Sequence, residues 1–403
     1  MSSLLDYLDM PELWEEFLTF KQQKQLSGGK DRELQEFIRN REYLPVVQAM
    51  QQNKEFPVPR KAEIGKMGSE KKRTVYIYPK AENYCLKLLT FLLIRKYDHL
   101  FADNLYSFRA HRDVKLAFRR LARYPGIEKM FTYKVDISNY FNSVDVEQFL
   151  PILRKNMADD PECCEFLVRL LQEPGVYDRG KWISERKGFM AGTPQSSFFA
   201  NLYLADMDRT FEEQGILYSR YSDDIIVFAR DQEELERCRA LIGQMLAQKG
   251  LTVNPKKEIS TAPGEKWTYL GFSFENGIID ISPVSVTKIK HKMRRKARAL
   301  KRWQNRKGLN GECAAKAFVR AMNHKLFDNP ADHELTWARW FCPVINTTAS
   351  LAEIDRYEQD CIRYLVTDRR TKARFNCRYE QMKSFGYRSL VHEYYAEWPE
   401  IPG

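Results

Sequence analysis

Residues 220–230 read RYSDDIIVFAR, and two adjacent aspartates, Asp223 and Asp224, stand directly before an apolar run from Ile225 to Ala229. Such a run is typical of a buried strand. Asp is a common turn residue, so a turn between two strands is one interpretation of the pair. A bound divalent cation is the other, because adjacent like charges beside a hydrophobic core need compensation.

The composition indicates a globular protein. The chain has 403 residues, of which 43% are hydrophobic, and this length suits two or three domains. Its first ten residues lack the cationic start of a signal peptide, and the longest apolar run, Leu86 to Ile94, is too short to span a bilayer. We therefore expect a cytoplasmic protein without a membrane partner. The eight cysteines form no C-x-x-C pair, which disfavours a zinc site.

The net charge of +11 comes from one segment. Residues 288–307, KIKHKMRRKARALKRWQNRK, contain eleven Lys and Arg and no acid, which leaves 54 bases against 54 acids elsewhere. Helical spacing places one set of cations on a common face: Lys288, Lys292, Arg295, Arg302 and Arg306. A solvated helix face is one interpretation. The absence of acids favours a surface that binds the phosphates of nucleic acid.

The hydrophobic periodicity changes twice along the chain. Residues 1–130 are predicted to be mostly helical, with a strand pair near residues 74–78; residues 131–282 mix strands and helices, and residues 283–403 are helical again. The strands expected in the middle part cover residues 131–137, 215–221, 224–230 and 267–274. The helices expected there cover residues 146–156, 198–214 and 232–249.

A third aspartate, Asp136, ends the predicted strand in FTYKVDI. If this strand lies beside the one that follows Asp224, three carboxylates converge at one edge of a sheet. Such a cluster is stabilised by divalent cations. Two Mg²⁺ ions roughly 3.5–4 Å apart are the arrangement used for in-line phosphoryl or nucleotidyl transfer.

An ordered set of motifs carries a clear resemblance to a known family. Tyr221-Ser222-Asp223-Asp224 looks like the YxDD motif of reverse transcriptases, and VDISNYF looks like the aspartate motif that precedes it. The further blocks are KKRTVYIYP (71–79), NLYSFRAHRD (104–113), LTVNPKKEIS (251–260) and WTYLGFSF (267–274). They resemble, in order, two finger motifs, the lysine-bearing motif after YxDD and the primer-grip hairpin. The resemblance spans about residues 60 to 280.

The resemblance implies a metal site. Asp136, Asp223 and Asp224 are its expected catalytic ligands, with the main-chain carbonyl of Ile137 as a further ligand. The expected cofactor is a pair of Mg²⁺ ions, for which Mn²⁺ can substitute.

It also implies a nucleotide site. Phe141 matches the bulky residue that excludes a ribose 2′-hydroxyl, although plain core packing is its other interpretation. Lys72 and Arg73 match finger residues that meet the triphosphate. The remaining candidates are Gly192, Gln195 and Lys257.

Residues 188–201, GFMAGTPQSSFFAN, resemble the block G-x-P-Q-G-x-x-x-S-P-x-x-x-N. Counting back from Asn201 aligns Gly192 and Ser196 with this block and places its Gln at Ala191. Gln195 is therefore a candidate only by its position near the block. For Gly192 we expect close approach to a template base, with a simple turn at the start of a helix as the alternative.

For nucleic acid, the resemblance implies contacts from Arg109 in the second finger motif and from Tyr269 and Gly271 in the primer-grip hairpin. The basic segment 288–307 is the expected first helix of a thumb. Trp303 is either a stacking residue or part of the core.

The predicted fold is α+β, a right-hand polymerase with fingers (1–130), palm (131–282) and a helical thumb (283–403). The implied function is RNA-directed DNA synthesis, with an RNA template, dNTPs and a DNA product. Three alternatives stay open: a template-independent or protein-primed DNA polymerase, a palm-fold nucleotide cyclase, and a noncatalytic RNA-binding scaffold.

Within the bacterial enzymes of the retron and group II intron lineage, the chain most resembles compact reverse transcriptases of abortive infection and anti-phage defence. Their palm block often departs from PQG, as it does here, and the tail segments TWARWFCPVINTTASLAEIDRY and FGYRSLVHEYY also look like that group. The resemblance implies a cognate noncoding RNA as template. The sequence predicts no oligomeric state.

Overall fold

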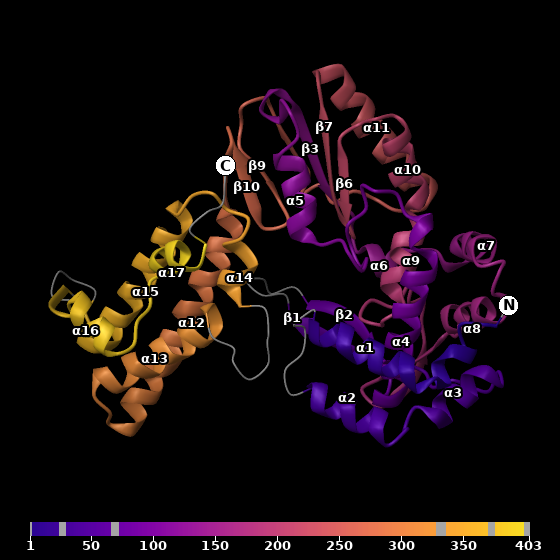
Figure 1. Ribbon diagram of the computed structural model, residues 1–403, viewed down its shortest axis with the longest axis horizontal. Coiled ribbons are helices and arrows are strands. Elements are labelled where there is room, and N and C mark those ends of the chain that lie inside the picture. The colour runs from indigo at the N-terminus through magenta and orange to yellow at the C-terminus, as the bar shows by residue number, and fades with distance from the viewer. Residues whose placement is uncertain (1, 24–29, 66–71, 328–335, 370–374, 399–403) are drawn as a thin grey trace. The chain divides into compact units, whose positions relative to one another are not determined.

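The computed structural model describes residues 2–23, 30–65, 72–327, 336–369 and 375–398 (Figure 1). The chain divides into two compact units between Glu265 and Lys266, called here the N-terminal and the C-terminal unit. The predicted three-part division at residues 130 and 282 stays a prediction. Helices and sheets occur in both units, so the predicted α+β class is confirmed.

The N-terminal unit contains most of the described helices. They are α1 (Pro11–Gln23), α2 (Lys30–Arg39), α3 (Leu44–Gln51), α4 (Lys80–Tyr97), α5 (Val114–Ala122), α6 (Tyr140–Ser143), α7 (Val146–Asn156), α8 (Pro161–Gln172), α9 (Ser196–Tyr203), α10 (Ala205–Glu213) and α11 (Gln232–Gln248), with the short turns η1 (Asp6–Asp9), η2 (Asp98–Leu100) and η3 (Ile127–Lys129). The apolar run from Leu86 to Ile94 lies in α4, which packs against α1, α3 and α9 in the core. None of the described helices is long and apolar enough to cross a membrane.

A first sheet of this unit has the strand order β2-β1-β4-β5. Its strands are β1 (Arg60–Gly65), β2 (Lys72–Ile77), β4 (Gly175–Asp178) and β5 (Lys181–Ser184). The predicted strand near residue 74 is β2. The hairpin of β4 and β5 was not predicted. Its turn residues, Arg179 and Gly180, both have positive φ, as a two-residue hairpin turn requires.

The second sheet has the order β6-β7-β3-β8, and all its neighbouring strands are antiparallel. It consists of β3 (Phe131–Asp136), β6 (Tyr218–Tyr221), β7 (Asp224–Ala229) and β8 (Ile259–Thr261). Residues 225–229 of β7 are buried, as their apolar run predicted, and α11 packs against β3 and β7 (Figure 1). The predicted neighbours β3 and β7 are therefore paired.

The helix expected over residues 198–214 is two helices. α9 ends at Tyr203 and α10 begins at Ala205, because Leu204 between them has a φ of −111° and a ψ of 14°, outside the helical range. No Gly or Pro marks this break, so the periodicity gave no sign of it. The break lets Asp208 on α10 point into the core, where it is fully buried.

The C-terminal unit combines a small sheet with a helical bundle. Its strands β9 (Trp267–Tyr269), β10 (Phe272–Glu275) and β11 (Ile278–Ile281) form an antiparallel sheet in the order β11-β10-β9. Its helices are α12 (Pro283–Lys307), α13 (Gly311–Leu326), α14 (Trp337–Phe341), α15 (Ala349–Thr367), α16 (Tyr379–Ser384) and α17 (Leu390–Glu397). α12, α13 and α15 pack against one another. The predicted basic helix is α12, which starts at a Ser282 cap and ends at Gly308 with φ +62°.

Candidate active site

The two adjacent aspartates lie at the tip of a tight hairpin. Tyr221 at the end of β6 pairs with Asp224 at the start of β7, so only Ser222 and Asp223 form the loop. Ser222 has a φ of +59°, a backbone conformation that residues other than glycine rarely adopt. The turn interpretation of the pair and the cation interpretation are therefore compatible, since the turn itself places the carboxylates.

The register of the sheet brings the third carboxylate to the same edge. Asp136 at the end of β3 is the direct partner of Asp224 across the strands, and the N–H of Ile137 donates to the carbonyl of Asp223 at 3.0 Å. One carboxylate oxygen from each of Asp136, Asp223 and Asp224 lies within 4.8 Å of the other two. The predicted convergence of the three aspartates is confirmed.

Burial and mutual repulsion oppose ionisation of this cluster. Burial, followed by the charge of Asp223, raises the pKa of Asp224 to about 6. Burial and then Asp136 raise the pKa of Asp223, against the opposing charges of Lys257 and Arg73. The neighbouring Lys134 on β3 has a lowered pKa because it is desolvated. Two carboxyls thus bind protons more tightly than ordinary aspartates do.

Two residues that follow α11 hold Asp136. The ammonium of Lys257 forms an ion pair with its carboxylate, and Asn254 donates from Nδ2 to Oδ1 at 3.4 Å. The N–H of Asn254 also donates to the carbonyl of Asp136 at 2.8 Å. Lys257 was predicted near the nucleotide, and its side chain remains 44% exposed. Asn254 was not predicted, although it lies in the quoted motif LTVNPKKEIS.

A chain of buried hydrogen bonds supports the strained turn. Ser222 donates its N–H to Ser107 Oγ at 2.9 Å, and this hydroxyl donates to Asn201 Oδ1 at 2.9 Å. Asn201 Nδ2 returns a bond of 2.8 Å to the carbonyl of Ser107. Ser107 and Asn201 are fully buried. Asn201, the last residue of the block aligned over residues 188–201, is thereby joined to the aspartate hairpin.

A buried ion pair lies beneath the same hairpin. Arg220 donates from Nε to Asp208 Oδ1 at 2.7 Å and from Nη2 to Oδ2 at 2.5 Å, and neither side chain is exposed. Tyr218 also donates to Oδ1 at 3.0 Å. Burial alone would lower the pKa of Arg220, but Asp208 raises it above its usual value. The residue that begins the stretch RYSDD is thus a fixed part of the core, with a charge that needs its partner.

The donor set suits a divalent cation. Three carboxylates at mutual distances within 4.8 Å offer hard oxygen ligands, which Mg²⁺ and Mn²⁺ prefer. Burial and then the neighbouring carboxylates raise the pKa of Asp223 and of Asp224, against the opposing charges of Lys257, Arg73 and Lys134. A bound cation would compensate the negative charge of the carboxylates. The carbonyl of Ile137 as a further ligand stays a prediction.

Two predicted nucleotide-site residues lie together beside the cluster. The guanidinium of Arg73 lies 5.8 Å from the ring centre of Phe141, and its charge acts on Asp223. Phe141 is 8% exposed and contacts Tyr140, so its ring is also part of the core. Lys72, by contrast, forms an exposed ion pair of 2.8 Å with Glu63 within the first sheet. Its contact with a triphosphate stays a prediction.

Gly192 and Gln195 have different surroundings from those expected. Gly192 has a φ of +99°, and a Cβ there would lie 3.0 Å from Val75 Cβ and 3.2 Å from the carbonyl of Tyr76. The close approach at this glycine is to strand β2, and the expected approach to a template base stays a prediction. Gln195 is fully buried, and its amide has no hydrogen-bond partner among the described residues.

Arg109, which was expected to contact nucleic acid, is bound within the fold, and that contact stays a prediction. Its guanidinium is buried, with bonds of 2.7 and 2.8 Å to the carboxylate of Asp98 and of 2.7 Å to the carbonyl of Ala102. These bonds use its donors within the fold. Arg109 therefore ties η2 to the segment before α5.

Tyr269 and Gly271 also have structural roles in the C-terminal unit. Tyr269 is fully buried, and the nucleic-acid contact expected of it stays a prediction. It pairs with Phe272 across a turn in which Leu270 and Gly271 have φ of +50° and +96°. A Cβ on Gly271 would lie 3.3 Å from Ser285 Oγ and 3.5 Å from the Phe341 ring. Turn geometry and close packing require this glycine.

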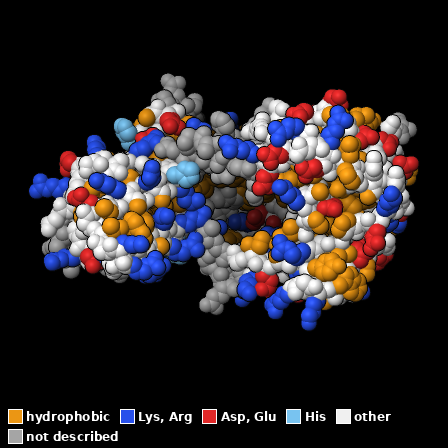
Figure 2. Space-filling view, turned by 90° about the horizontal axis from the view of Figure 1, so that it is seen from below, with side chains coloured by type: hydrophobic (Ala, Val, Ile, Leu, Met, Phe, Trp, Pro, Cys, Tyr) orange, Lys and Arg blue, Asp and Glu red, His pale blue; other side chains and the backbone are white. Residues whose placement is uncertain are grey.

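The cations of α12 divide into two groups. Lys290 and Lys301 form ion pairs with Glu353 and Asp368 of the same unit. Lys292 instead has a pKa lowered by burial and by the like charges of Lys325, Arg295 and Lys288. Figure 2 shows Lys and Arg side chains gathered over the visible face of this unit. Arg302 and Arg306 follow on the same helix face. The predicted cationic stripe therefore exists, and α13 extends it through Lys325.

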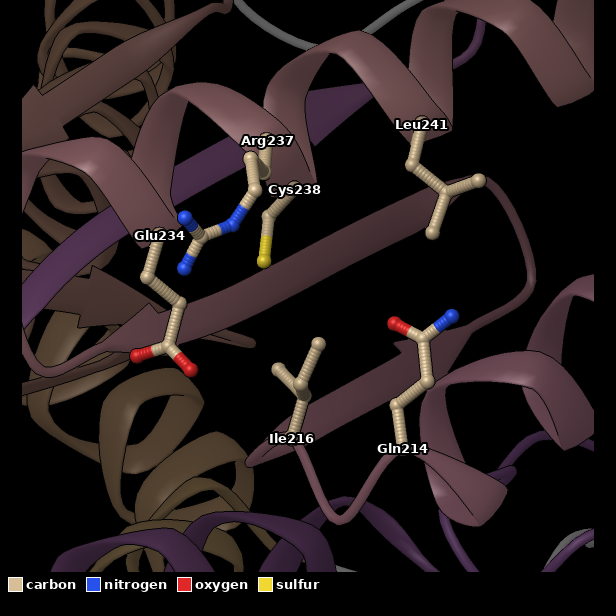
Figure 3. Close-up of a pocket in the computed structure, with 6 residues that line it drawn as sticks. All are labelled: Gln214, Ile216, Glu234, Arg237, Cys238 and Leu241. Atoms are coloured by element: carbon tan, nitrogen blue, oxygen red, sulfur yellow. The ribbon is translucent and has the colours of Figure 1, made fainter.

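A pocket of about 260 Å³ lies elsewhere in the N-terminal unit (Figure 3). Glu234, Arg237, Cys238 and Leu241 of α11 and Gln214 and Ile216, between α10 and β6, line it. None of the predicted site residues is among them.

The buried ion pair makes a testable contribution to stability. Asp208→Asn should lower the free energy of unfolding by about 3–5 kcal/mol, because it leaves Arg220 charged and without its anion. Asp206→Asn is the matched control on the same helix: Asp206 pairs with Lys249 at the surface, and its loss should cost less than about 1 kcal/mol. Denaturant unfolding measures both. Equal losses would contradict the account.

The aspartate cluster should make metal-free stability depend on pH. The pKa of Asp224 is raised in the folded protein. The contribution of this carboxyl to the free energy of unfolding is therefore greatest at a pH below its pKa in the unfolded chain, and it is lost as the pH rises through about 6. In the presence of a chelator, Asp224→Asn should therefore be more stable than the wild type at pH 7, by on the order of 2 kcal/mol, and similar to it at pH 4. Thermal unfolding with chelator measures this. Added Mg²⁺ should raise the midpoint of the wild type more than that of Asp224→Asn; equal shifts would exclude these carboxylates as the ion's ligands.

One of three comparisons with known proteins identifies a family. The family model described as "Reverse transcriptase (RNA-dependent DNA polymerase)" matches residues 64–274, more than half of the chain. No curated protein matches. Among solved structures, apo telomerase from Candida tropicalis, truncated from its C-terminal domain, is similar, with 12% identity and a TM-score of 0.46 over 56% of this chain. The chain spans 55% of that structure's length.

The matched segment contains the whole second sheet of the N-terminal unit with the aspartate hairpin, strands β2, β4 and β5 and the end of β1 in the first sheet, and strand β9 with most of β10 in the C-terminal unit. The predicted fold class, a right-hand polymerase, agrees with it. The chain belongs to the reverse transcriptases, the family of RNA-dependent DNA polymerases.

Proposed function

We propose that this protein copies RNA into DNA, extending the 3′-hydroxyl of a primer with dNTPs. The convergence of Asp136, Asp223 and Asp224 at one sheet edge carries the proposal, because this cluster lies within the segment that matches the family. Arg73 and Phe141 beside the cluster support a nucleotide site there. The RNA template and the DNA product follow from the family.

The three carboxylates would hold two Mg²⁺ ions, or Mn²⁺ in their place. When bound, such ions activate the attacking hydroxyl and neutralise the charge on the triphosphate and the leaving oxygen. The chain's own residues position the ligands. The β3–β7 register fixes Asp136 opposite Asp224, and the bonds of Ser107 and Asn201 hold the turn that carries Asp223. A rigid cluster of this kind is pre-organised for transfer.

The cations near the cluster have separate proposed roles. Arg73, with Lys72 on the same strand, would bind the triphosphate, since a guanidinium fork matches phosphate oxygens. Lys257 would leave Asp136 when a cation binds there and would then face the nucleotide; its partly exposed side chain allows such a movement. Gly192, next to β2, and Gln195 would line the nucleotide site beside the aspartates rather than contact phosphate.

The basic face of α12 would bind the phosphate backbone of the template–product duplex. Lys288, Lys292 and Arg295 repel one another and Lys325, so a polyanion would stabilise them. Contacts of this kind determine affinity and carry no base specificity.

The cellular role is also a proposal. The tail segments and the departure from PQG support a compact bacterial enzyme of anti-phage defence, which copies a cognate noncoding RNA in the cytoplasm. Sequencing the RNA that copurifies with the protein would test this. An unselected mixture of cellular RNA would speak against a cognate template.

The aspartates should be essential for synthesis. Wild-type protein with Mg²⁺, dNTPs and a primed RNA template should make complementary DNA, and Asp223→Asn with Asp224→Asn should reduce the rate at least about 1,000-fold, because the ligands of the ion are lost. Glu233→Gln is the control, since Glu233 is an exposed acid of α11. Radiolabelled incorporation measures both. Product formed without template would indicate template-independent synthesis, and RNA binding without incorporation would indicate a scaffold.

Phe141 should select deoxynucleotides. Phe141→Ala should raise the ratio of kcat/KM for a ribonucleotide to that for the matching dNTP by about tenfold or more, because removing the ring makes room for a 2′-hydroxyl. The ratio serves as its own control, since a merely structural loss would lower both values alike. An unchanged ratio in a folded variant would assign Phe141 to the core alone.

A further inference from the structure

The hairpin of β4 and β5 presents two aromatic rings to solvent. Tyr177 and Trp182 are direct partners across the hairpin, and they are 45% and 55% exposed. Directly paired residues share a face of the sheet, so both rings lie on the same side. On the other side Val176 is fully buried and Ile183 packs against the core. The hairpin is therefore anchored by one face and open on the other.

Trp182 is held in place against the backbone of the hairpin. A Cβ on Gly175 would come within 2.5 Å of its Nε1, so the indole lies directly over this glycine. The glycine makes room for the ring, and more than half of the residue's surface nevertheless remains exposed. An indole fixed in this way loses little conformational freedom when a second flat ring stacks on it.

Three exposed cations lie on the strands and the turn around the two rings. Arg60 on β1 is the direct neighbour of Tyr177, it is exposed, and it forms no ion pair within the described part of the chain. Arg179 and Lys181, at the turn and the start of β5, are exposed as well. Two acids lie on or beside this hairpin: Asp178 follows Tyr177 and alternates to the opposite face, and Glu173 accepts the N–H of Gly175 at 2.7 Å. Glu185, in contrast, binds Lys61 and Tyr76, whose side chains alternate to the opposite face.

The same sheet face continues to the active site. Alternation along β1 places Arg60 and Ile64 on one face, and Ile64 is the partner of Arg73 on β2. Arg73 contacts Phe141 and acts on Asp223. From β2 to β5 the face spans three strand spacings of about 4.8 Å, or roughly 14 Å. A single strand of nucleic acid that left the active site across this sheet face would reach the two rings after this distance.

We propose that Tyr177 and Trp182 form a stacking platform for unpaired bases of a nucleic-acid strand, with Arg60 contacting its backbone. The inference rests on the proposed function. The bound strand would be the single-stranded part of the template outside the active site. Interleaved cations and exposed rings suit this ligand, because every base has a face to stack and every linkage has a phosphate. A protein partner would need a larger continuous apolar patch than these two rings.

The first test is binding of a short unstructured RNA oligonucleotide, without primer, to the full chain. Fluorescence anisotropy should show an affinity about tenfold lower for Trp182→Ala, and lower still for Tyr177→Ala with Trp182→Ala. Trp182→Phe should retain most of it, since it keeps a ring. Tyr124→Ala, which removes an exposed tyrosine near the end of α5, should bind as the wild type does. Unchanged binding by the folded double variant would overturn the proposal. A DNA oligonucleotide of the same sequence tests whether the platform distinguishes RNA from DNA.

The salt dependence separates the rings from the charge. Arg60→Gln should reduce the slope of log K against log salt by about 1, because it loses one phosphate contact. Trp182→Ala should lower the affinity and leave the slope unchanged. A changed slope in Trp182→Ala would mean that the loss is electrostatic or structural, and would contradict stacking.

Photocrosslinking needs no variant and therefore does not depend on its folding. Wild-type protein irradiated with RNA that contains 5-iodouridine should be crosslinked at Tyr177 or Trp182; crosslinks confined to other peptides would overturn the platform. This result is independent of polymerisation. Crosslinks at the two rings without dNTP incorporation would leave the platform and remove the proposed function, whereas incorporation without these crosslinks would do the reverse.

Discussion

The pairing of β3 with β7 is the constraint on which the functional part of this protein depends. The observed register pairs Phe131 with Ala229 and Val135 with Ile225, and a shift by one residue would take Asp136 away from Asp224. That register places Asp136 opposite Asp224. Burial of the carboxylates and then their like charges destabilise the metal-free sheet, as the raised pKa of Asp224 indicates, and the apolar contacts of β7 offset this cost.

Buried polar groups then determine the geometry of the turn. Ser222 has a positive φ without being glycine, and its N–H is held by Ser107, which Asn201 orients. Arg220 adds a buried charge, which Asp208 neutralises. Such networks stabilise one conformation when every member has a partner. The break at Leu204, which turns Asp208 into the core, is therefore part of how the aspartate hairpin is supported.

The sequence predicted what depends on local pattern: the apolar run of β7, the helices α7 and α11, the amphipathic α12 and the three aspartates. It did not predict the surroundings that tertiary contacts determine. Arg109 and Tyr269 lie in motifs that resemble nucleic-acid contacts, but the first is bound to Asp98 and the second is buried. The strands β4 and β5 are short, and β4 joins the sheet through β1, far away in the sequence, so no local periodicity indicated them.

The central claim is that the three aspartates bind the divalent ions of nucleotidyl transfer. A crystal structure of the protein with Mn²⁺, a primed RNA template and a nonhydrolysable dNTP analogue tests it most directly, because Mn²⁺ is located by its anomalous scattering. The account predicts anomalous peaks within coordination distance of the carboxylates of Asp136, Asp223 and Asp224, with the triphosphate as a shared ligand. A nucleotide bound with its Mn²⁺ away from these carboxylates would contradict the account.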